Sequence, residues 1–449
     1  METKKEGFPA AFWVCACTEI FERLAYYLGR SLILIFVTAS VATGGLGLSD
    51  TVAANMQSNL TAFSYLLPLF GTVIVDKYIG ARYTTPVGMF IAAAGYFTGG
   101  IAKSSAGVYA MIFLVSLGLA LFKNGAIIGR VITDKSQMDP AFSMRYTLVN
   151  VGAFIGTFLV GILYKDVFAK DGVLGFAPCF KMAALMMVLG GLWYIFVCWR
   201  FLGDLGKLPF KKTLTEEEKA AEAKKKEETG TKQPLTTIEK KRIGAIFVAS
   251  LFSIVFWIFW YLGYMPVYFY WAENMDWVVA GYQVPSTWFD AANSLFCVIL
   301  GPVTAALWKK LAARPQGDMS LFRKTGLGIA IIGVGYLFYA AIDIMRGGEK
   351  ASVLWLIVFA FLLTMGEMFF SPLGHSFISK YSPSRYLAVM MSVWGFATFI
   401  AAKSYGPVYG LLFGGKIEFK VACIGVAVVS FAAALIMIAL DKTLSALVD

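Results

Sequence analysis

Long apolar runs recur along this chain, and they constrain its fold more than any other feature of the sequence. Each run is long enough to cross the ~30 Å hydrocarbon core of a bilayer as an α-helix. We predict twelve such spans, over residues 10–43, 52–76, 83–102, 106–132, 142–164, 178–201, 242–270, 288–312, 322–344, 351–378, 385–413 and 418–441. With 58% hydrophobic and 15% charged residues, the 449-residue chain has too little polar surface for a soluble protein. The sequence therefore predicts an all-α membrane protein.

The basic residues between the spans indicate its orientation. With a cytoplasmic N-terminus, about 27 lysines and arginines fall in cytoplasmic segments and about 8 outside. The even number of spans places both termini on one side. We therefore expect a multi-pass protein of the cell membrane, plasma or inner, whose N- and C-termini are cytoplasmic. Because the net charge of +11 follows this loop bias, nucleic acid is not an expected partner.

One long polar stretch, residues 203–241, interrupts the series of spans. It contains TEEEKAAEAKKKEETGTKQP, in which Glu/Lys pairs favour a partly helical, solvated tether. A specific partner-binding role is the alternative. The stretch divides the chain into residues 1–202 and 242–449, with six predicted helices each. Two six-helix bundles joined by a cytoplasmic linker resemble the layout of the major facilitator superfamily.

Four ionisable residues lie in the first predicted helix, where each costs roughly 2.5–3.5 kcal/mol at membrane depth. Glu19, Glu22, Arg23 and Arg30 share a stripe about 100° wide with Tyr26. A stripe of acids and bases in an otherwise apolar helix predicts that this face borders a wet cavity or a polar partner helix. The alternative is a static intrahelical ion-pair lattice, in which Glu19 pairs with Arg23 one turn away.

Polar side chains also occur within four other predicted helices. They are Lys123, the pair Tyr146 and Asn150, the pair Asp290 and Asn293, and Glu367. An isolated Lys or Asn often serves only as a hydrogen-bonding group between helices. Because acids and bases occur in both halves of the chain, we interpret the set as the lining of a shared central cavity.

Covalent chemistry has little support in the composition. The single His and the six dispersed Cys have no metal-ligand spacing, and no nucleophile–base pair stands out. We therefore expect neither an enzyme, nor a metal site, nor an organic cofactor.

Three segments together resemble the proton-dependent oligopeptide transporter (POT) family of the major facilitator superfamily. EIFERLAYYLGR, from Glu19 to Arg30, is similar to its E-x-x-E-R motif. AFSMRYTLVNVGAFIG resembles the fifth-helix signature and keeps Tyr146 and Asn150. GEMFFSPLGHSFISKYSPSRYLAVMMSVW resembles the tenth-to-eleventh-helix stretch and keeps Glu367.

The resemblance implies a symporter that couples inward proton movement to the uptake of di- and tripeptides by alternating access. Arg30 and Lys123 would hold the peptide carboxylate, and Glu367 would hold its amino terminus. The remaining residues of the pocket would be Tyr27, Tyr65, Asn150, Asn293 and Trp394. Proton coupling would involve Glu19, Glu22, Arg23 and Lys123. Short peptides and the lipid bilayer are the implied partners, protons are the coupling ion, and a monomer is expected.

Three departures from the family pattern bear on substrate and coupling. In the seventh helix Tyr261 stands where the family has an acid, and Asp290 is the candidate to replace that acid. The fourth-helix F-K-P-N becomes Phe122-Lys123-Asn124-Gly125, and the eighth-helix N-P becomes Asn293-Ser294. These departures leave open that the chain is a divergent family member that carries another solute, such as an organic or inorganic anion, or that acts as a uniporter. A non-transporting membrane sensor is a further alternative.

Overall fold

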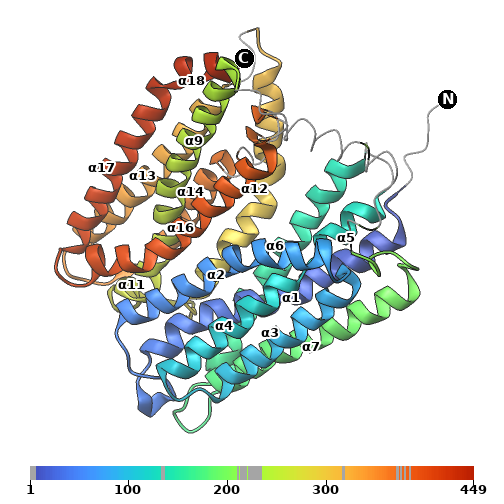
Figure 1. The fold of residues 1–449 in the computed structure, drawn as a ribbon. Helices are drawn as coiled ribbons and strands as arrows, with labels where there is room; N and C mark the ends of the chain where they lie inside the picture. Colours follow the sequence, from blue (N-terminus) through green and yellow to red (C-terminus); the bar gives the residue numbers. More distant parts are fainter. Residues whose placement is uncertain are drawn as a thin grey trace. The chain divides into compact units, whose positions relative to one another are not determined.

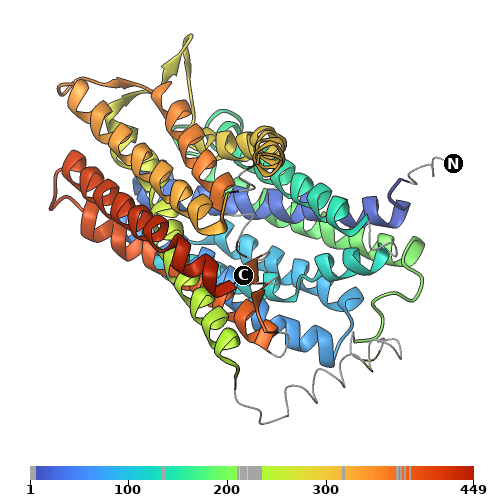
Figure 2. The same cartoon turned by 90° about the horizontal axis from the view of Figure 1, so that it is seen from above.

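The computed structural model describes residues 7–132, 137–209, 212, 220, 235–315, 319–370, 374, 377–378, 381–383 and 386–448. These residues are predominantly helical, as Figures 1 and 2 show from two directions. They form two compact units, and each is described here by itself. Most of the predicted linker lies outside the described residues. So do Ser371, Pro372 and His375 of the GEMFFSPLGHS stretch. The predicted domain boundaries at residues 202 and 242 therefore stay predictions.

Unit 1 comprises Met1–Leu48 and Leu66–Leu214. Its elements are α1 (Ala10–Thr38), a 3-10 turn (Val41–Thr43), the second part of α2 (Asp50–Lys77), α3 (Ala81–Ile101), α4 (Ser105–Leu121), α5 (Asn124–Val131), α6 (Met138–Ile162), a π-helical turn (Leu163–Val167) and α7 (Phe176–Arg200). Within the unit α1 packs against α6 and α7, and α3 packs against α4 and α7.

Unit 2 comprises Ser49–Tyr65 and Thr215–Asp449. Besides the first part of α2 it contains α9 (Thr237–Leu262), α10 (Met265–Tyr268), α11 (Tyr270–Asn274), α12 (Trp288–Ala312), α13 (Leu321–Met345), α14 (Trp355–Phe370), α16 (Leu387–Phe413), α17 (Phe419–Ala439) and α18 (Asp441–Val448). Four two-residue strands, β1 (Met275–Asp276), β2 (Val278–Val279), β3 (Tyr282–Gln283) and β4 (Ala351–Ser352), lie between helices. β1 pairs with β4 in parallel, and β2 pairs with β3 antiparallel.

Each of the twelve predicted spans contains a helix, and the first, fourth, seventh and tenth differ from the prediction in detail. In the first, α1 ends at Thr38, and a separate 3-10 turn follows at Val41–Thr43. The fourth is broken at Phe122 and Lys123, between α4 and α5. The seventh begins earlier, because Thr236 caps α9: its hydroxyl accepts a hydrogen bond from the Glu239 amide at 3.2 Å, and Glu239 Oε2 accepts one from the Thr236 amide at 2.8 Å. The tenth begins later, because Ala351–Ser352 form β4 before α14 starts.

Small residues let helices approach closely inside each unit. A Cβ at Gly156 of α6 would lie 2.4 Å from the Leu24 carbonyl oxygen of α1. In unit 2, a Cβ at Gly406 of α16 would lie 2.9 Å from the Ala54 oxygen of α2. Such contacts are typical of helices packed in membranes, where small residues allow backbones to meet.

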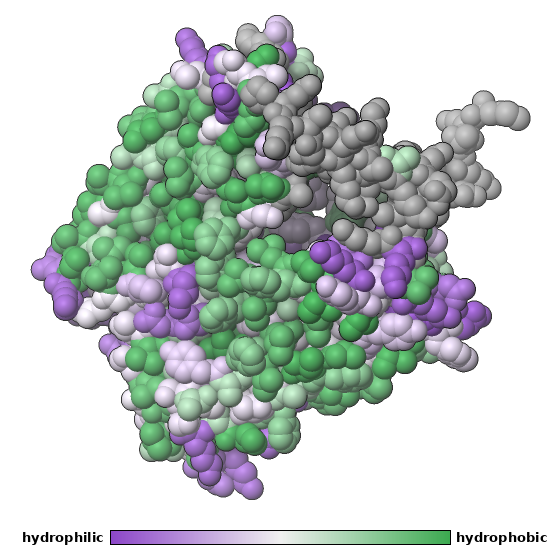
Figure 3. All heavy atoms as spheres, in the orientation of Figure 1, coloured by the Kyte–Doolittle hydropathy of each residue, from purple (hydrophilic) through white to green (hydrophobic). Residues whose placement is uncertain are grey.

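Eight helices in the described part of the chain are long and apolar enough to cross a membrane. Figure 3 shows apolar residues covering most of the visible helix surfaces. α1 does not belong to this set. Its four ionisable residues are more than an ordinary span carries, although three of them, Glu19, Glu22 and Arg30, are buried against the rest of the protein.

Candidate functional site

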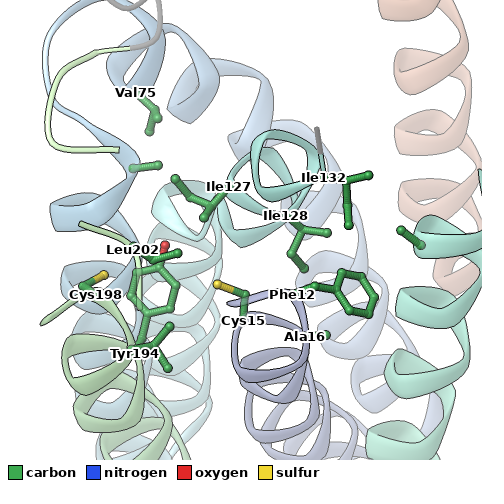
Figure 4. Close-up of a cluster of buried hydrophobic side chains, with 13 residues drawn as sticks. Phe12, Cys15, Ala16, Val75, Ile127, Ile128, Ile132, Tyr194, Cys198 and Leu202 are labelled. Atoms are coloured by element: carbon green, nitrogen blue, oxygen red, sulfur yellow. The ribbon is translucent and has the colours of Figure 1, made fainter. Parts of the chain in front are cut away.

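The charged stripe of α1 is placed by packing on α5, α6 and α7. In a buried cluster, Phe12 and Cys15 of α1 lie near Ile127 and Ile128 of α5, with Tyr194 and Cys198 of α7 beside them (Figure 4). One turn beyond this cluster α1 carries Glu19, which is only 2% exposed. Apolar packing therefore fixes the start of the stripe inside unit 1.

Glu19 and Glu22 have different partners. The guanidinium of Arg145 on α6 donates from Nε to Glu19 Oε1 at 2.9 Å. Glu22, which is fully buried, accepts hydrogen bonds from both Nε and NH2 of Arg23, the latter at 2.6 Å from Oε1. Glu19 therefore does not pair with Arg23 as the intrahelical alternative expected, although the Glu22–Arg23 pair does lie within α1.

Lys123 lies at the break between α4 and α5. Its ammonium donates to the Pro68 carbonyl oxygen at 2.8 Å and to the Thr72 hydroxyl at 2.9 Å, both on α2. In the described part of unit 1 its hydrogen bonds thus go to α2, and not to the acids with which we expected it to act. The proposed role of Lys123 in proton coupling stays a prediction.

Arg30 lies deeper in α1, where it is 5% exposed. Its guanidinium carbon is 6.0 Å from the ring centre of Tyr27, within the range of a cation–π contact. The structure therefore brings these two predicted pocket residues together. Asn150 of α6 instead donates to the Tyr146 carbonyl oxygen at 3.0 Å, on its own helix.

In unit 2 the carboxylate of Glu367 on α14 is surrounded by neutral donors. Asn293 of α12 donates from Nδ2 to Glu367 Oε2 at 3.2 Å and to the Thr364 hydroxyl at 2.8 Å. The Cys297 thiol donates to the same carboxylate at 3.8 Å, and the Trp260 indole lies beside it. Among the described residues no cationic side chain pairs with Glu367.

Two other aromatic residues predicted for the pocket, Tyr65 and Trp394, belong to unit 2. Tyr261 of α9 donates to the Tyr65 hydroxyl of α2 at 3.1 Å, so the residue that replaces the family acid makes a neutral contact. Trp394 is buried, stacks on Phe370 at 6.3 Å, and lines a small apolar hollow with Gly374. Trp394 of α16 therefore lies against Phe370, the last residue of α14.

Asp290 of α12 is buried and accepts a hydrogen bond from the Tyr268 hydroxyl. This contact lies within unit 2, whereas Arg30 belongs to unit 1. The hypothesis that Asp290 replaces the missing acid as the partner of Arg30 stays a prediction.

Sequence reasoning missed Arg145, Trp260 and Cys297. Arg145 occurs near the cytoplasmic end of a predicted span, where a basic residue ordinarily extends to the lipid surface. The spacing of Asn293 and Cys297, four residues apart on α12, was a usable signal because such residues share a helix face. Nothing in the sequence pairs Trp260 with Glu367.

Known proteins resemble this chain along most of its length. A sequence model described as the POT family matches residues 205–413. An uncharacterized transporter, YclF, from Bacillus subtilis is 25% identical over 439 residues, covering 89% of this chain and 87% of its own length. A protein named di-/tripeptide transporter from Lactococcus lactis is 24% identical, with 86% of each chain covered.

Solved structures resemble the fold. A peptide transporter POT in complex with sulfate matches with a TM-score of 0.87 at 22% identity, over 99% of this chain and 98% of that one. A POT family transporter in complex with 5-aminolevulinic acid matches with a TM-score of 0.85 at 23% identity, over 98% of both chains. These matches confirm the all-α membrane fold of the major facilitator type that the sequence predicts.

Proposed function

We propose that this chain, which belongs to the POT family, imports di- and tripeptides together with protons by alternating access. The family consists of transporters, so the chain is a transporter and not an enzyme. Relatives of nearly the same length carry the names di-/tripeptide transporter and peptide transporter, which supports the substrate class. They are 24% identical to this chain.

The environment of Glu367 is the observation that carries the proposal. A carboxylate buried among neutral donors is costly unless a cation or a proton neutralises it. Asn293 and Cys297 donate hydrogen bonds to the carboxylate without neutralising it. The ammonium group of a peptide amino terminus supplies the missing positive charge and three donors.

The residues proposed to bind the carboxylate end of the peptide belong to unit 1. Arg30 is buried beside Tyr27 and offers a rigid fork of donors that matches a carboxylate. Lys123, held on α2 by Pro68 and Thr72, is the second cation proposed to bind the carboxylate. A zwitterionic peptide requires these opposite charges at its two ends, and a low dielectric strengthens both interactions. Tyr65, Asn150 and Trp394 are proposed as further lining residues.

The acids of α1 are proposed to couple protons to this movement. A carboxylate that gains a proton releases its basic partner, and the released charge changes the balance between two conformations. Glu22, which is fully buried, forms such a pair with Arg23, whose side chain is partly exposed. Protons are then the coupling ion, and no organic cofactor is needed.

The chain is a multi-pass membrane protein. We place it in the cell membrane with both termini cytoplasmic, because the basic residues gather in the loops that this orientation makes cytoplasmic. We propose a monomer as the transporting unit, since one chain supplies both groups of charged residues.

A second candidate substrate class is another small solute that carries both an amine and a carboxylate, or an anion alone. Tyr261 replaces an acid of the family pattern and makes a neutral contact with Tyr65. A solved transporter of 23% identity binds 5-aminolevulinic acid, and one of 22% identity binds sulfate. Substrate therefore has to be tested with a panel and not with one peptide.

Purified protein in liposomes would be tested for uptake of labelled dialanine, trialanine, 5-aminolevulinic acid and sulfate. Each solute would be offered with and without an inward proton gradient. Peptide accumulation that requires the gradient supports the proposal. Uptake only of the acid or the anion supports the second candidate, and ligand-induced thermal stabilisation without flux supports a sensor.

A further inference from the structure

Arg145 belongs to none of the predicted site positions, yet it contacts the charged stripe directly. Its Nε donates to Glu19 Oε1 at 2.9 Å, across the packed pair α1 and α6. The side chain of Glu19 is 2% exposed, and that of Arg145 is 31% exposed. The buried carboxylate of Glu19 is therefore paired with a guanidinium that is partly exposed to solvent.

The residues at the start of α5 complete this arrangement. Asn124 donates from Nδ2 to the same Glu19 oxygen at 3.1 Å and to the Cys15 carbonyl oxygen at 2.9 Å. A Cβ at Gly125 would lie 3.1 Å from both Cζ and NH2 of Arg145. Asn124 therefore supplies a second donor, and Gly125 supplies the space that the guanidinium occupies.

These positions coincide with a departure already visible in the sequence. Where the resembled motif reads F-K-P-N, this chain has Phe122-Lys123-Asn124-Gly125. Proline has no side-chain donor, and a larger residue in place of Gly125 would crowd Arg145. Lys123 directly precedes Asn124, and its ammonium donates to the Pro68 carbonyl oxygen and the Thr72 hydroxyl of α2. The substitutions and Arg145 thus form one site, and the lysine lies outside it.

We propose that Arg145 is a positioning residue that keeps Glu19 ionised and directed toward α5. This inference rests on the proposed function and adds Arg145 to its coupling step. Without a cation, ionised Glu19 would be a buried uncompensated charge, and taking up a proton would relieve it.

Several ionisable groups surround the Glu19–Arg145 pair and would respond to its loss. They are Glu22, Arg23 and Cys15 on α1, and Tyr194 and Cys198 of α7, which lie near Cys15. We therefore compare variants of Glu19 and Arg145 with one another, because the surrounding ionisable groups are the same in all of them.

The first test is spectroscopic and requires no substrate. Infrared spectra of purified Arg145→Gln, Arg145→Lys, Glu19→Gln and Glu19→Gln/Arg145→Gln would be compared with the unaltered protein at neutral pH. We expect a protonated-carboxyl band in Arg145→Gln that is absent from the double variant, from Arg145→Lys and from the unaltered protein. A Glu19 band already present in the unaltered protein, or absent from Arg145→Gln, would overturn the inference.

The second test measures transport with the same proteins in liposomes. We expect Arg145→Gln to lose gradient-driven dialanine accumulation about ten-fold, a usual size for coupling between sites, while counterflow exchange is largely kept. Arg145→Lys should regain accumulation, because its ammonium still pairs with Glu19. Equal losses of accumulation and exchange, together with a lowered melting temperature, would reduce the pair to a structural contact and contradict the proposal.

The two tests separate failure of the inference from failure of the proposed function. If the unaltered protein moves no peptide, the proposed function fails, and the infrared comparison still decides whether Arg145 keeps Glu19 ionised. If peptide accumulates and Arg145→Gln behaves like the unaltered protein in both tests, only the role of Arg145 is rejected.

Discussion

The amide of Asn293 donates to both Glu367 Oε2, at 3.2 Å, and the Thr364 hydroxyl, at 2.8 Å. One side chain of α12 thereby fixes the rotamer of an acid on α14. Because the other groups at the acid are a thiol and an indole, the carboxylate remains without a positive partner among the described residues. This arrangement supports the proposal that Glu367 binds a cation, because Glu367 is not one half of an ion pair among the described residues.

Glu367→Gln is expected to weaken the binding of dialanine roughly ten- to a hundred-fold, the loss of one charge-assisted hydrogen bond. N-acetylated dialanine lacks the ammonium group, so its binding should change far less. Competition against labelled peptide uptake measures both affinities. Equal losses for the two peptides would remove the assigned role from Glu367.

Glu22→Gln is expected to abolish proton-driven accumulation and to leave counterflow exchange largely intact. The amide keeps the shape of the side chain but cannot exchange a proton, so binding and alternation survive without the driving force. Accumulation under an inward proton gradient and exchange without one are compared in the same liposomes. Accumulation at the unaltered level would exclude Glu22 from coupling.

Asp290→Asn is expected to change the pH dependence of dialanine uptake, since Asp290 is the candidate for the acid missing at Tyr261. Tyr268→Phe removes the hydroxyl that donates to Asp290 but keeps the carboxylate, so it serves as the matched control. Uptake over a series of external pH values measures the effect. An unchanged profile in Asp290→Asn would mean that this residue does not take the place of the missing acid.

Gly156→Ala is expected to destabilise unit 1 by about 1–3 kcal/mol, the usual effect of overpacking. Its Cβ would lie 2.4 Å from the Leu24 backbone oxygen, which cannot move without displacing α1. Gly425→Ala is the control, because a Cβ there meets nothing within 4 Å. Melting temperatures in detergent compare the two, and an equal effect would contradict the close α1–α6 contact.

The twelve spans were predictable because membrane thickness sets the length of an apolar helix. The break at Phe122–Lys123 was not predicted, although Lys123-Asn124-Gly125 interrupts the apolar run and Asn-Gly is a turn signal. Thr236 and Glu239 form a capping box that is readable in the sequence, yet the predicted span starts at residue 242 because charged residues follow the cap.

The site was only partly predictable for a similar reason. The helical spacing placed Glu19, Glu22, Arg23 and Arg30 on one face, which needs only the geometry of one helix. Choosing between Arg23 and Arg145 as the partner of Glu19 requires knowing that Gly156 brings α6 against α1. Such pairings depend on contacts between helices distant in sequence, which residue spacing does not contain.

The most direct test of coupled transport is the electrical current that follows addition of dialanine to liposomes adsorbed on a solid-supported membrane. Dialanine carries no net charge near neutral pH, so a current arises only if an ion moves with it. We expect an inward positive current that depends on external pH and disappears in Glu22→Gln. Uptake of labelled dialanine without any current would contradict proton-coupled import by this chain.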